Sequence, residues 1–258
     1  MIDTAIILAA GEGTRLRAAA PSKPLCPVGG KPLVDHALER LAMAGIARAI
    51  VVTGYRGAEL TAHLAAGGQT GQGWPLAVET VAVTDWALPN GVSALAGGRA
   101  AGGASLLVMC DHLVNPALYR LMAEVGAGAG LRLGIDRNLD SDAVDLDDVT
   151  CVETDGATRI VAIGKGLASY DAFDTGVFAV GPAFYAALAA LDAPSITEGV
   201  RVLAAQGLAL VEDVGSLDWI DVDDPPALAM AERRMERPIP AKALGASRLR
   251  RLPLASRP

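Results

Sequence analysis

The segment Leu8-Ala9-Ala10-Gly11-Glu12-Gly13-Thr14-Arg15-Leu16 decides the fold of this 258-residue chain. It follows a continuous apolar run at residues 5–8, which is typical of a strand buried on both faces of a parallel sheet. A glycine loop at the carboxyl end of such a strand offers backbone N–H groups to an anion, and glycine lets the chain come close to a phosphate. The segment therefore predicts a phosphate-binding loop on an α/β fold.

Two other kinds of glycine loop fit this segment poorly. A dinucleotide-binding loop needs a third glycine where Leu16 stands and a helix that starts at once, yet the chain runs into Pro21 and Pro24. A P-loop needs Gly-Lys-Ser/Thr, which the segment lacks. The dinucleotide interpretation is kept only as a minor alternative.

Outward from the loop, apolar runs with strand character alternate with segments of helical spacing. Predicted strands cover residues 5–8, 49–53, 76–81, 106–110 and 131–135, and predicted helices cover residues 33–41, 58–64, 92–101 and 117–125. Because strand, helix and strand follow one another, right-handed crossovers and a parallel sheet are expected.

The pattern changes after residue 136, where residues 136–148 are acidic and loop-like. A hairpin at 150–153 and 159–163, strands at 176–180, 208–212 and 219–222, and helices at 195–205 and 226–235 follow. We therefore expect an α/β fold with a Rossmann-like, mostly parallel sheet, helices on both faces and a small antiparallel lobe. One domain is expected over residues 1–236, with halves at 1–135 and 136–236, before a basic, proline-containing tail at 237–258.

The composition is that of a soluble globular protein, with 52% hydrophobic and 20% charged residues. A net charge of −7 argues against a surface built to coat nucleic acid. The three cysteines Cys26, Cys110 and Cys151 lack metal-type spacing and predict reduced thiols in a cytoplasmic protein. No apolar run approaches the roughly 20 residues of a membrane helix, and no basic segment precedes the first apolar run, so neither a membrane span nor a signal peptide is expected.

The pattern L-A-A-G-x-G-T-R-L, followed by Lys-Pro-Leu at 23–25, resembles the nucleotidyltransferase family that makes sugar and polyol nucleotides. The family usually has Pro before the lysine, where this chain has Ser22. The resemblance implies a fold of the nucleotide-diphospho-sugar transferase type, with a nucleotide-binding half at 1–135 and an acceptor-binding half at 136–236. It also implies that the loop wraps a triphosphate through Leu8, Ala9, Ala10, Gly11, Gly13 and Thr14.

Arg15 and Lys23 are the catalytic residues that the resemblance implies, because both contact phosphates in the family. The chemistry agrees, since in-line attack on an α-phosphate gathers charge that fixed cations stabilise. A solvated loop lysine is the simpler alternative for Lys23. We favour the catalytic role because Pro21 and Pro24 stiffen its position.

Three aspartates are candidate Mg²⁺ ligands. Asp111 follows the predicted strand at 106–110, at the sheet edge where ligands bind in open α/β folds. Asp221 and Asp223 lie two residues apart in W-I-D-V-D-D-P, so a strand there places both carboxylates on one face. Asp111 with one of this pair supplies the oxygen ligands that Mg²⁺ prefers, and the resemblance slightly favours Asp223. Asp224 is expected to cap the next helix.

Four residues are candidates for reading the base and ribose. Asn90, Gly91 and Ser93 open a predicted helix in the region where the family binds these groups, and Thr53 ends the second predicted strand. A turn residue and a helix-start residue are the simpler interpretations of Asn90 and Ser93. For Asn90 and Ser93, a purely structural role and a role in ligand binding are given equal weight.

Several segments resemble one branch of the family, the inositol-1-phosphate cytidylyltransferases. They are residues 108–112, 163–165, 174–178 and 219–223. The resemblance implies that CTP is the nucleotide and that the acceptor-binding residues are His112, Lys165, Asp174, Thr175 and Gly176. Lys165 is suited to a phosphate and Asp174 to polyol hydroxyls. The alternative for Lys165 is a solvated lysine, and the alternative for Asp174 is an aspartate that starts a strand. For His112, a role in supporting a neighbouring ligand, or no role at all, has the same weight as contact with the acceptor.

The predicted reaction transfers CMP from CTP to a polyol 1-phosphate, with inositol 1-phosphate first, and releases pyrophosphate. Rival enzymes use UTP, dTTP or GTP with a hexose 1-phosphate, or CTP with phosphocholine or a phosphonate. A nucleotide-binding regulator without turnover is the alternative of another class, although it need not keep Lys23, Asp111 and Asp223. Monomer and homodimer are both compatible with the sequence.

The tail at 237–258 carries six basic residues and no acidic one. A solvated basic extension is the simpler interpretation of this composition. Weak docking to an anionic membrane or to a membrane-embedded enzyme is the alternative.

Overall fold

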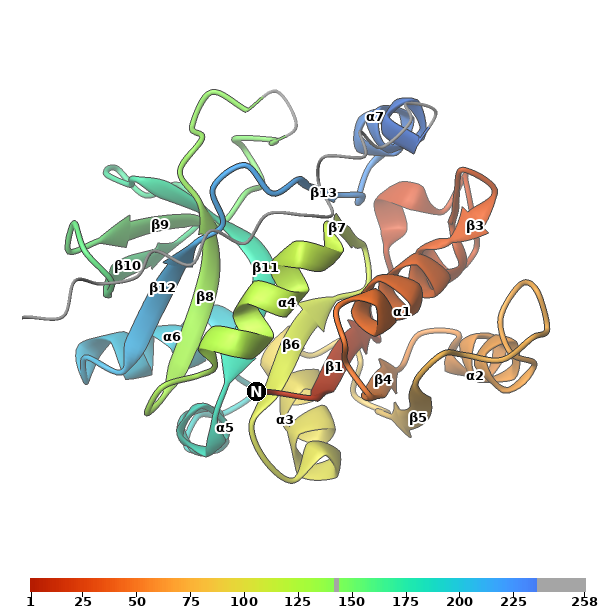
Figure 1. Cartoon of the computed structure of the whole chain (residues 1–258), viewed down its shortest axis with the longest axis horizontal. Helices are drawn as coiled ribbons and strands as arrows, with labels where there is room; N and C mark the ends of the chain where they lie inside the picture. Colours follow the sequence, from red (N-terminus) through yellow and green to blue (C-terminus); the bar gives the residue numbers. More distant parts are fainter. Residues whose placement is uncertain (142–143, 236–258) are drawn as a thin grey trace, which may run out of the picture.

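The glycine loop leaves the carboxyl end of an interior strand of a nine-stranded sheet (Figure 1). This strand, β1 (Thr4–Ala9), runs parallel to β4 (Arg48–Thr53) on one side and to β6 (Ser105–Met109) on the other. Beyond β4 lies the parallel strand β5 (Ala77–Ala82). The carboxyl ends of four parallel strands therefore meet at one edge, where open α/β sheets bind ligands. The computed structural model describes residues 1–141 and 144–235.

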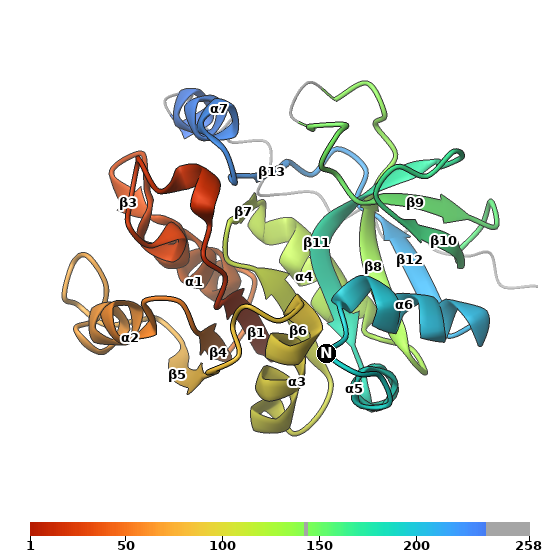
Figure 2. The ribbon, with the colours of Figure 1, turned by 180° about the vertical axis from the view of Figure 1, so that it is seen from behind.

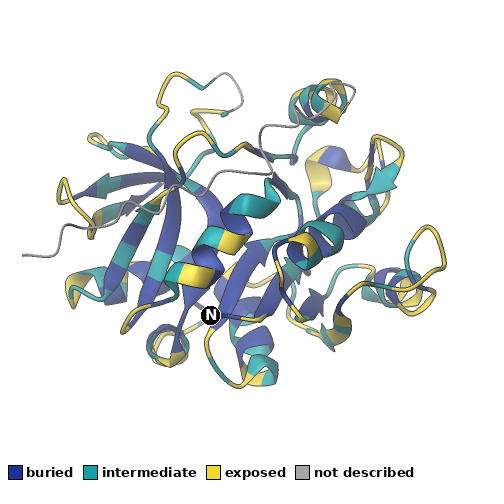
Figure 3. Cartoon of the chain, viewed as in Figure 1, coloured by how far each residue is buried: buried dark blue, intermediate teal, exposed yellow. Residues whose placement is uncertain are grey.

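Helices cover both faces of this sheet because successive β1 side chains point to opposite sides. Ile6 and Ile7 are both fully buried, and they belong to different core clusters. The Ile7 face is covered by α1 (Leu33–Met43), α2 (Gly57–Ala65) and α4 (Pro116–Val125). The Ile6 face is covered by α3 (Asn90–Ala101), α5 (Pro182–Ala189) and α6 (Ile196–Ala205), as seen from behind in Figure 2. Figure 3 shows the resulting buried strands between exposed helix faces.

The second half of the chain continues the same sheet. Its long strand β11 (Ala172–Val180) pairs antiparallel with β6. The remaining strands of this half are β8 (Leu131–Asp136), β9 (Cys151–Thr154), β10 (Ile160–Gly164) and β12 (Ala209–Asp213). All pair antiparallel except β12, which runs parallel to β8. The predicted fold class, a mostly parallel core with an antiparallel lobe, is confirmed.

The end of the described chain returns to the carboxyl edge of the sheet. There β13 (Trp219–Asp221) pairs antiparallel with β7 (His112–Val114), which follows β6 directly. Asp224 caps the last helix, α7 (Pro225–Met235), by accepting a hydrogen bond from Ala227 N–H at 2.7 Å, as predicted. A small hairpin of β2 (Pro27–Val28) and β3 (Lys31–Pro32) contacts α7.

Four features differ from the sequence-based expectations. The helix α5 and the strand β7 were not predicted, because α5 is apolar on most sides and β7 is only three residues long. The strand expected at 176–180 begins earlier, and a register shift inside it accommodates Gly176 at φ +74°. The strand β13 ends at Asp221, so Asp223 lies beyond it and the two carboxylates do not share a strand face.

Among residues 1–141 and 144–235, no helix has both the length and the apolar character that a bilayer crossing requires. The predicted basic tail at 237–258 lies outside the described residues, so its docking to a membrane stays a prediction.

Candidate active site

Gly13 lets Lys23 reach the carboxyl edge of the sheet. Gly13 has φ +59°, and a Cβ at this position would lie 2.4 Å from Cβ of Lys23. Only glycine meets both conditions, because side-chain residues are strained at this φ and clash at this distance. Lys23 then extends from a 3₁₀ turn to form an ion pair with Asp111, the residue that follows β6 by two positions.

Lys23 remains charged in this position. Its side chain is 14% exposed, so burial opposes the charge. The carboxylates of Asp111 and Asp221 outweigh that effect and hold the pKa of Lys23 above its ordinary value. The predicted catalytic lysine and the predicted metal ligand Asp111 are therefore direct neighbours.

Arg15 connects the glycine loop to the second half of the chain. Its guanidinium donates to Asp148 Oδ2 at 2.6 Å and also pairs with Asp223. The other oxygen of Asp148 pairs with Lys165, which follows β10. Hydrogen bonds from Lys165 and Arg15 hold the pKa of Asp148 well below its usual range. One carboxylate thus joins Arg15 and Lys165, two of the three cations predicted to bind phosphates.

Asp111, His112 and Asp221 form a cluster that suits a metal ion. One ligand atom from each lies within 4.8 Å of the others. Nε2 of His112 is 3.4 Å from Asp221 Oδ2 and 3.9 Å from Asp111 Oδ1. The other oxygen of Asp221, Oδ1, is buried and has no hydrogen-bond partner among the described residues. An unpartnered buried carboxylate oxygen beside a second carboxylate fits a hard cation such as Mg²⁺.

The sequence slightly favoured Asp223 as the metal ligand, and the structure places that residue differently. Its carboxylate pairs with Arg15, whereas Asp221 lies opposite His112 in the β7–β13 pair. Burial and the nearby charge of Asp221 raise the pKa of Asp223 to about 6. The geometry therefore brings Asp221 closer to Asp111 and His112 than the sequence pattern suggested.

His112 is held in one orientation by the backbone of β11. Its Nδ1 lies 2.9 Å from the carbonyl oxygen of Thr175, which can only accept, so Nδ1 carries a hydrogen. Nε2 then faces the carboxylates. Burial opposes the charge of His112, but Asp221 and Asp111 raise its pKa to about 10. The imidazole is stacked on Trp219, with ring centroids 6.0 Å apart.

Gly176 makes room for this imidazole. A Cβ at Gly176 would lie 2.3 Å from Nδ1 of His112, and its φ is +74°. Thr175, by contrast, is fully buried and donates its hydroxyl to the carbonyl of Gly134 at 2.7 Å. Of this predicted acceptor-binding pair, Gly176 lines the cavity and Thr175 supports the strand.

We expect Gly176→Ala to lower the free energy of unfolding by about 2–3 kcal/mol, because backbone strain and the clash with His112 add together. Chemical denaturation of the purified variant measures this change. Gly215→Ala is the control, since Gly215 has φ +60° but an added Cβ would meet nothing within 4 Å. An equal loss in both variants would show that the approach of His112 has no energetic consequence.

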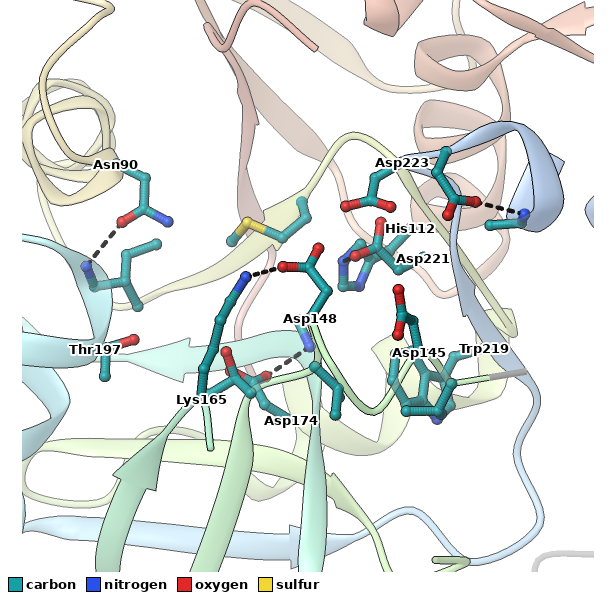
Figure 4. Close-up of a pocket in the computed structure, with 18 of the residues that line it drawn as sticks. Asn90, His112, Asp145, Asp148, Lys165, Asp174, Thr197, Trp219, Asp221 and Asp223 are labelled. Atoms are coloured by element: carbon teal, nitrogen blue, oxygen red, sulfur yellow. Dashed lines mark hydrogen bonds and ion pairs between the residues drawn. The ribbon is translucent and has the colours of Figure 1, made fainter. Parts of the chain in front are cut away.

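A polar cavity of about 260 Å³ joins the two halves of the chain. Figure 4 shows Lys165 pointing toward Asp148 across it, with Asp174, Asp221 and Asp223 around it. The lining residues are Arg15, Asn90, Met109, His112, Val144, Asp145, Asp148, Val149, Thr150, Lys165, Asp174, Gly176, Phe178, Ile196, Thr197, Trp219, Asp221, Asp223, Asp224 and Ala227. The predicted acceptor residues His112, Lys165 and Asp174 are thus brought together with Arg15 of the glycine loop.

Asp174 lies in the irregular part of β11. Its Oδ1 accepts a hydrogen bond from the backbone N–H of Gly176 at 2.7 Å. Burial raises the pKa of Asp174 to about 6, although that hydrogen bond opposes the shift. A carboxyl group in this state is suited to hydrogen bonds with hydroxyl groups as either donor or acceptor.

The candidates for base and ribose binding lie in different surroundings. Asn90 lines the cavity and accepts a hydrogen bond from Ile196 N–H at 2.9 Å. Gly91 packs against the loop before α6, because a Cβ there would lie 2.4 Å from the carbonyl oxygen of Pro194. Ser93 is buried inside α3, and Thr53 lines a separate hollow beside α2. Only Asn90 of the four lines the cavity.

Most of the glycine loop lies outside the cavity wall. Among its residues only Arg15 lines the cavity, whereas Leu8, Ala9, Ala10, Gly11, Gly13 and Thr14 do not. The carbonyl of Ala10 accepts a hydrogen bond from Tyr55 N–H at 2.9 Å, which ties the loop to the end of β4. Their predicted role in nucleotide binding stays a prediction.

Sequence reasoning missed several cavity residues, among them the polar residues Asp145, Asp148, Thr150 and Thr197 and the aromatic residue Trp219. The acidic run at 145–148 was recognised, but only as a loop. Its proximity to two cations, one from each half of the chain, was the signal that the sequence could not supply. Trp219 carried a signal in W-I-D-V-D, where only the aspartates were assigned a role.

Several known proteins are similar to this chain in sequence or in fold. Residues 5–133 match the model of the MobA-like NTP transferase domain. Two similar curated proteins are named bifunctional IPC transferase and DIPP synthase. The protein from Rubrobacter xylanophilus is 31% identical over 88% of this chain and 51% of its own length. The protein from Aquifex aeolicus is 30% identical over 90% of this chain and 52% of its own length. The chain therefore spans about half the length of these curated relatives.

A solved structure covers nearly the whole chain. The inositol-1-phosphate CTP transferase from T. maritima has a TM-score of 0.75 and 26% identity, over 91% of this chain and 95% of that protein. UDP-glucose pyrophosphorylase has the same TM-score at 16% identity, and that likeness concerns the fold alone. With residues 5–133 matched and the loop, lysine and carboxylates of the site in place, the chain belongs to the MobA-like NTP transferase domain family.

Proposed function

We propose that this protein is a cytidylyltransferase that transfers CMP from CTP to a polyol 1-phosphate, with inositol 1-phosphate as the first candidate. The observation that carries the proposal is the cavity in which Arg15 of the glycine loop meets Lys165 and Asp174 of the second half. The names of the two curated relatives and of the T. maritima protein support the choice of substrates. We further propose that the protein acts in the cytoplasm.

In the proposed reaction, an oxygen of the acceptor phosphate attacks the α-phosphorus of CTP and pyrophosphate leaves. Lys23 and Arg15 bind the triphosphate and neutralise charge that grows on its oxygens during the attack. Lys23 is suited to this role because neighbouring carboxylates keep it charged although it is buried. This direct attack requires no covalent intermediate with the protein.

Mg²⁺ is the cofactor that the proposal includes. Asp111 and Asp221 would hold it, with Asp223 as the alternative second ligand. When bound, the ion neutralises phosphate charge and orients the reacting groups. His112 lies beside both carboxylates and is fixed by Thr175, so it would position the oxygen ligands.

The acceptor side of the proposal depends on Lys165 and Asp174. Lys165 binds the acceptor phosphate, and the carboxyl group of Asp174 binds hydroxyl groups of the polyol. The cavity wall contains Trp219 and Phe178, but Trp219 is stacked on His112. Among the described residues, the cavity is therefore lined by several carboxylates and has no cage of aromatic faces, so a polyol phosphate fits better than phosphocholine.

Pyrophosphate release tests the proposal directly. The purified protein is assayed with Mg²⁺ and each of CTP, UTP, GTP, ATP and dTTP against inositol 1-phosphate, glucose 1-phosphate and phosphocholine. Release with CTP and inositol 1-phosphate alone is expected. Release with another pair would assign the chain to a sister enzyme, and nucleotide binding without any release would favour a regulator.

We expect Asp174→Asn to stabilise the metal-free protein increasingly as the pH rises from about 4 to about 7. An acid with a pKa of about 6 in the folded state and 3.8 when unfolded favours folding while protonated, and that contribution is lost as the pH rises through 6. The full shift corresponds to at most about 3 kcal/mol, and less for a partly buried group. Urea denaturation at several pH values, with EDTA, measures the difference.

Asparagine keeps the oxygen that accepts from Gly176 N–H, so the variant changes the charge and little else. A difference in unfolding free energy that stays constant between pH 4 and 7 would contradict the raised pKa of Asp174. Asp155→Asn is the matched control, because its exposed carboxylate has a lowered pKa and predicts the opposite sign.

A further inference from the structure

Asp148 lies between two cations that come from opposite halves of the chain. Its Oδ2 accepts a hydrogen bond from Nη2 of Arg15 at 2.6 Å, and its Oδ1 pairs with Nζ of Lys165. Arg15 follows the glycine loop after β1, whereas Lys165 follows β10. Figure 4 shows the Lys165–Asp148 pair projecting into the cavity from the side of the second half.

Both cations are accessible to another anion. The side chains of Arg15 and Lys165 are 49% and 58% exposed, while Asp148 is 28% exposed. Ion pairs with such exposure are weak, because water screens them and long side chains lose freedom when they form. In the part of the chain that the structure describes, Asp148 is the only ion-pair partner of Lys165, whereas Arg15 also pairs with Asp223.

We propose that Asp148 is an internal substitute for a substrate phosphate, holding Arg15 and Lys165 together in the free protein and releasing both when a phosphate group binds between them. Carboxylate and phosphate oxygens accept the same charge-assisted hydrogen bonds, so one pair of cations serves either anion. A phosphate group has more charge and more acceptor oxygens than the carboxylate, which favours the exchange.

Asp148 is therefore a positioning residue with two opposed effects. It keeps two like charges close together in the absence of substrate, and it competes with the phosphate that later binds there. The competition lowers phosphate affinity, so its removal must strengthen binding. The identification of this phosphate as that of the acceptor rests on the proposed function, whereas the exchange itself does not.

Titration of the metal-free protein with inorganic phosphate tests the exchange. Isothermal titration calorimetry at low salt should show that Asp148→Asn binds phosphate roughly three- to tenfold more tightly than the unaltered protein, since two exposed ion pairs no longer compete. Asparagine has the size of aspartate, so the variant is expected to fold, and thermal unfolding checks this. Asp148→Ser should give the same tightening.

Asp145→Asn is the matched control. Asp145 lies in the same loop and lines the same cavity, but no ion pair of the described residues includes it. This substitution removes the same charge without freeing a cation, so its effect on phosphate binding should stay within about twofold. The double variant Asp148→Asn, Lys165→Met should lose the gain, because the freed lysine is absent.

Three results would overturn the inference. They are unchanged phosphate affinity in both Asp148 variants, an equal gain in Asp145→Asn, and a gain that persists without Lys165. In an active enzyme, Asp148→Asn should lower KM for the acceptor more than it changes kcat, a split that a purely structural role does not produce. The phosphate titration needs no turnover, so it can support the exchange even if the proposed reaction is not found. Equally, the reaction can be found while the titration contradicts the exchange.

Discussion

Lys23→Met should reduce kcat by roughly 10²- to 10³-fold, the effect of removing one preorganised charge from a phosphoryl-transfer site. Lys23 is mostly buried, pairs with Asp111 and packs along Gly13, so its ammonium group is held in one place. Methionine retains most of the apolar stem and removes only the ammonium group. Single-turnover release of pyrophosphate measures the chemical step apart from substrate binding.

Lys31→Met is the matched control for this loss. Lys31 lies in β3, close in sequence to Lys23, and pairs with Glu39 away from the cavity. It should keep kcat within about twofold, because a partly exposed ion pair of this kind contributes little. A Lys23→Met variant with normal kcat and a raised KM for CTP would mean that the lysine binds the nucleotide without stabilising the transition state.

Asp111→Asn should reduce turnover by roughly 10³-fold or more, because it removes a charged metal ligand and also leaves Lys23 without its partner. The requirement for Mg²⁺ should rise at the same time. Both quantities come from pyrophosphate release measured over a range of Mg²⁺ concentrations. Binding of Mn²⁺, followed by its paramagnetic resonance signal, reports metal affinity without turnover.

The same measurements distinguish Asp221 from Asp223. Asp221→Asn should weaken Mn²⁺ binding strongly, because Asp221 shares the cluster with Asp111 and has an unpartnered oxygen. Asp223→Asn should affect nucleotide binding more, since Asp223 pairs with Arg15. The reverse ranking of the two variants in Mn²⁺ affinity would restore Asp223 as the ligand, as the sequence pattern favoured.

Local signals in the sequence were sufficient for most of the fold. The apolar run before the glycine loop predicted a strand buried on both faces, and Ile6 and Ile7 are indeed fully buried on opposite faces. The helix predicted at 195–205 is present as α6, and it begins with a capping box in which both hydrogen bonds between Ser195 and Glu198 are formed. Such features depend on neighbours within a few positions, so a single sequence reveals them.

The short and irregular elements escaped prediction for a related reason. The strand β7 has three residues and exists because β13, about a hundred residues later, pairs with it. The early start of β11 depends on Ala172 and Phe173, which pair with β9, and Phe173 also pairs with β8. Both elements are fixed by partners distant in sequence, which local propensity does not describe.

By itself, the sequence determined the glycine loop, the order of strands and helices, and the residue types Arg15, Lys23, Asp111, Lys165 and Asp174 that a phosphate-transferring site requires. Only the tertiary structure decided the partners: Lys23 with Asp111, Asp221 with His112, and Asp148 between Arg15 and Lys165. The reason is physical, because charge interactions act over a few ångströms in space, whereas the residues concerned are up to 133 positions apart along the chain.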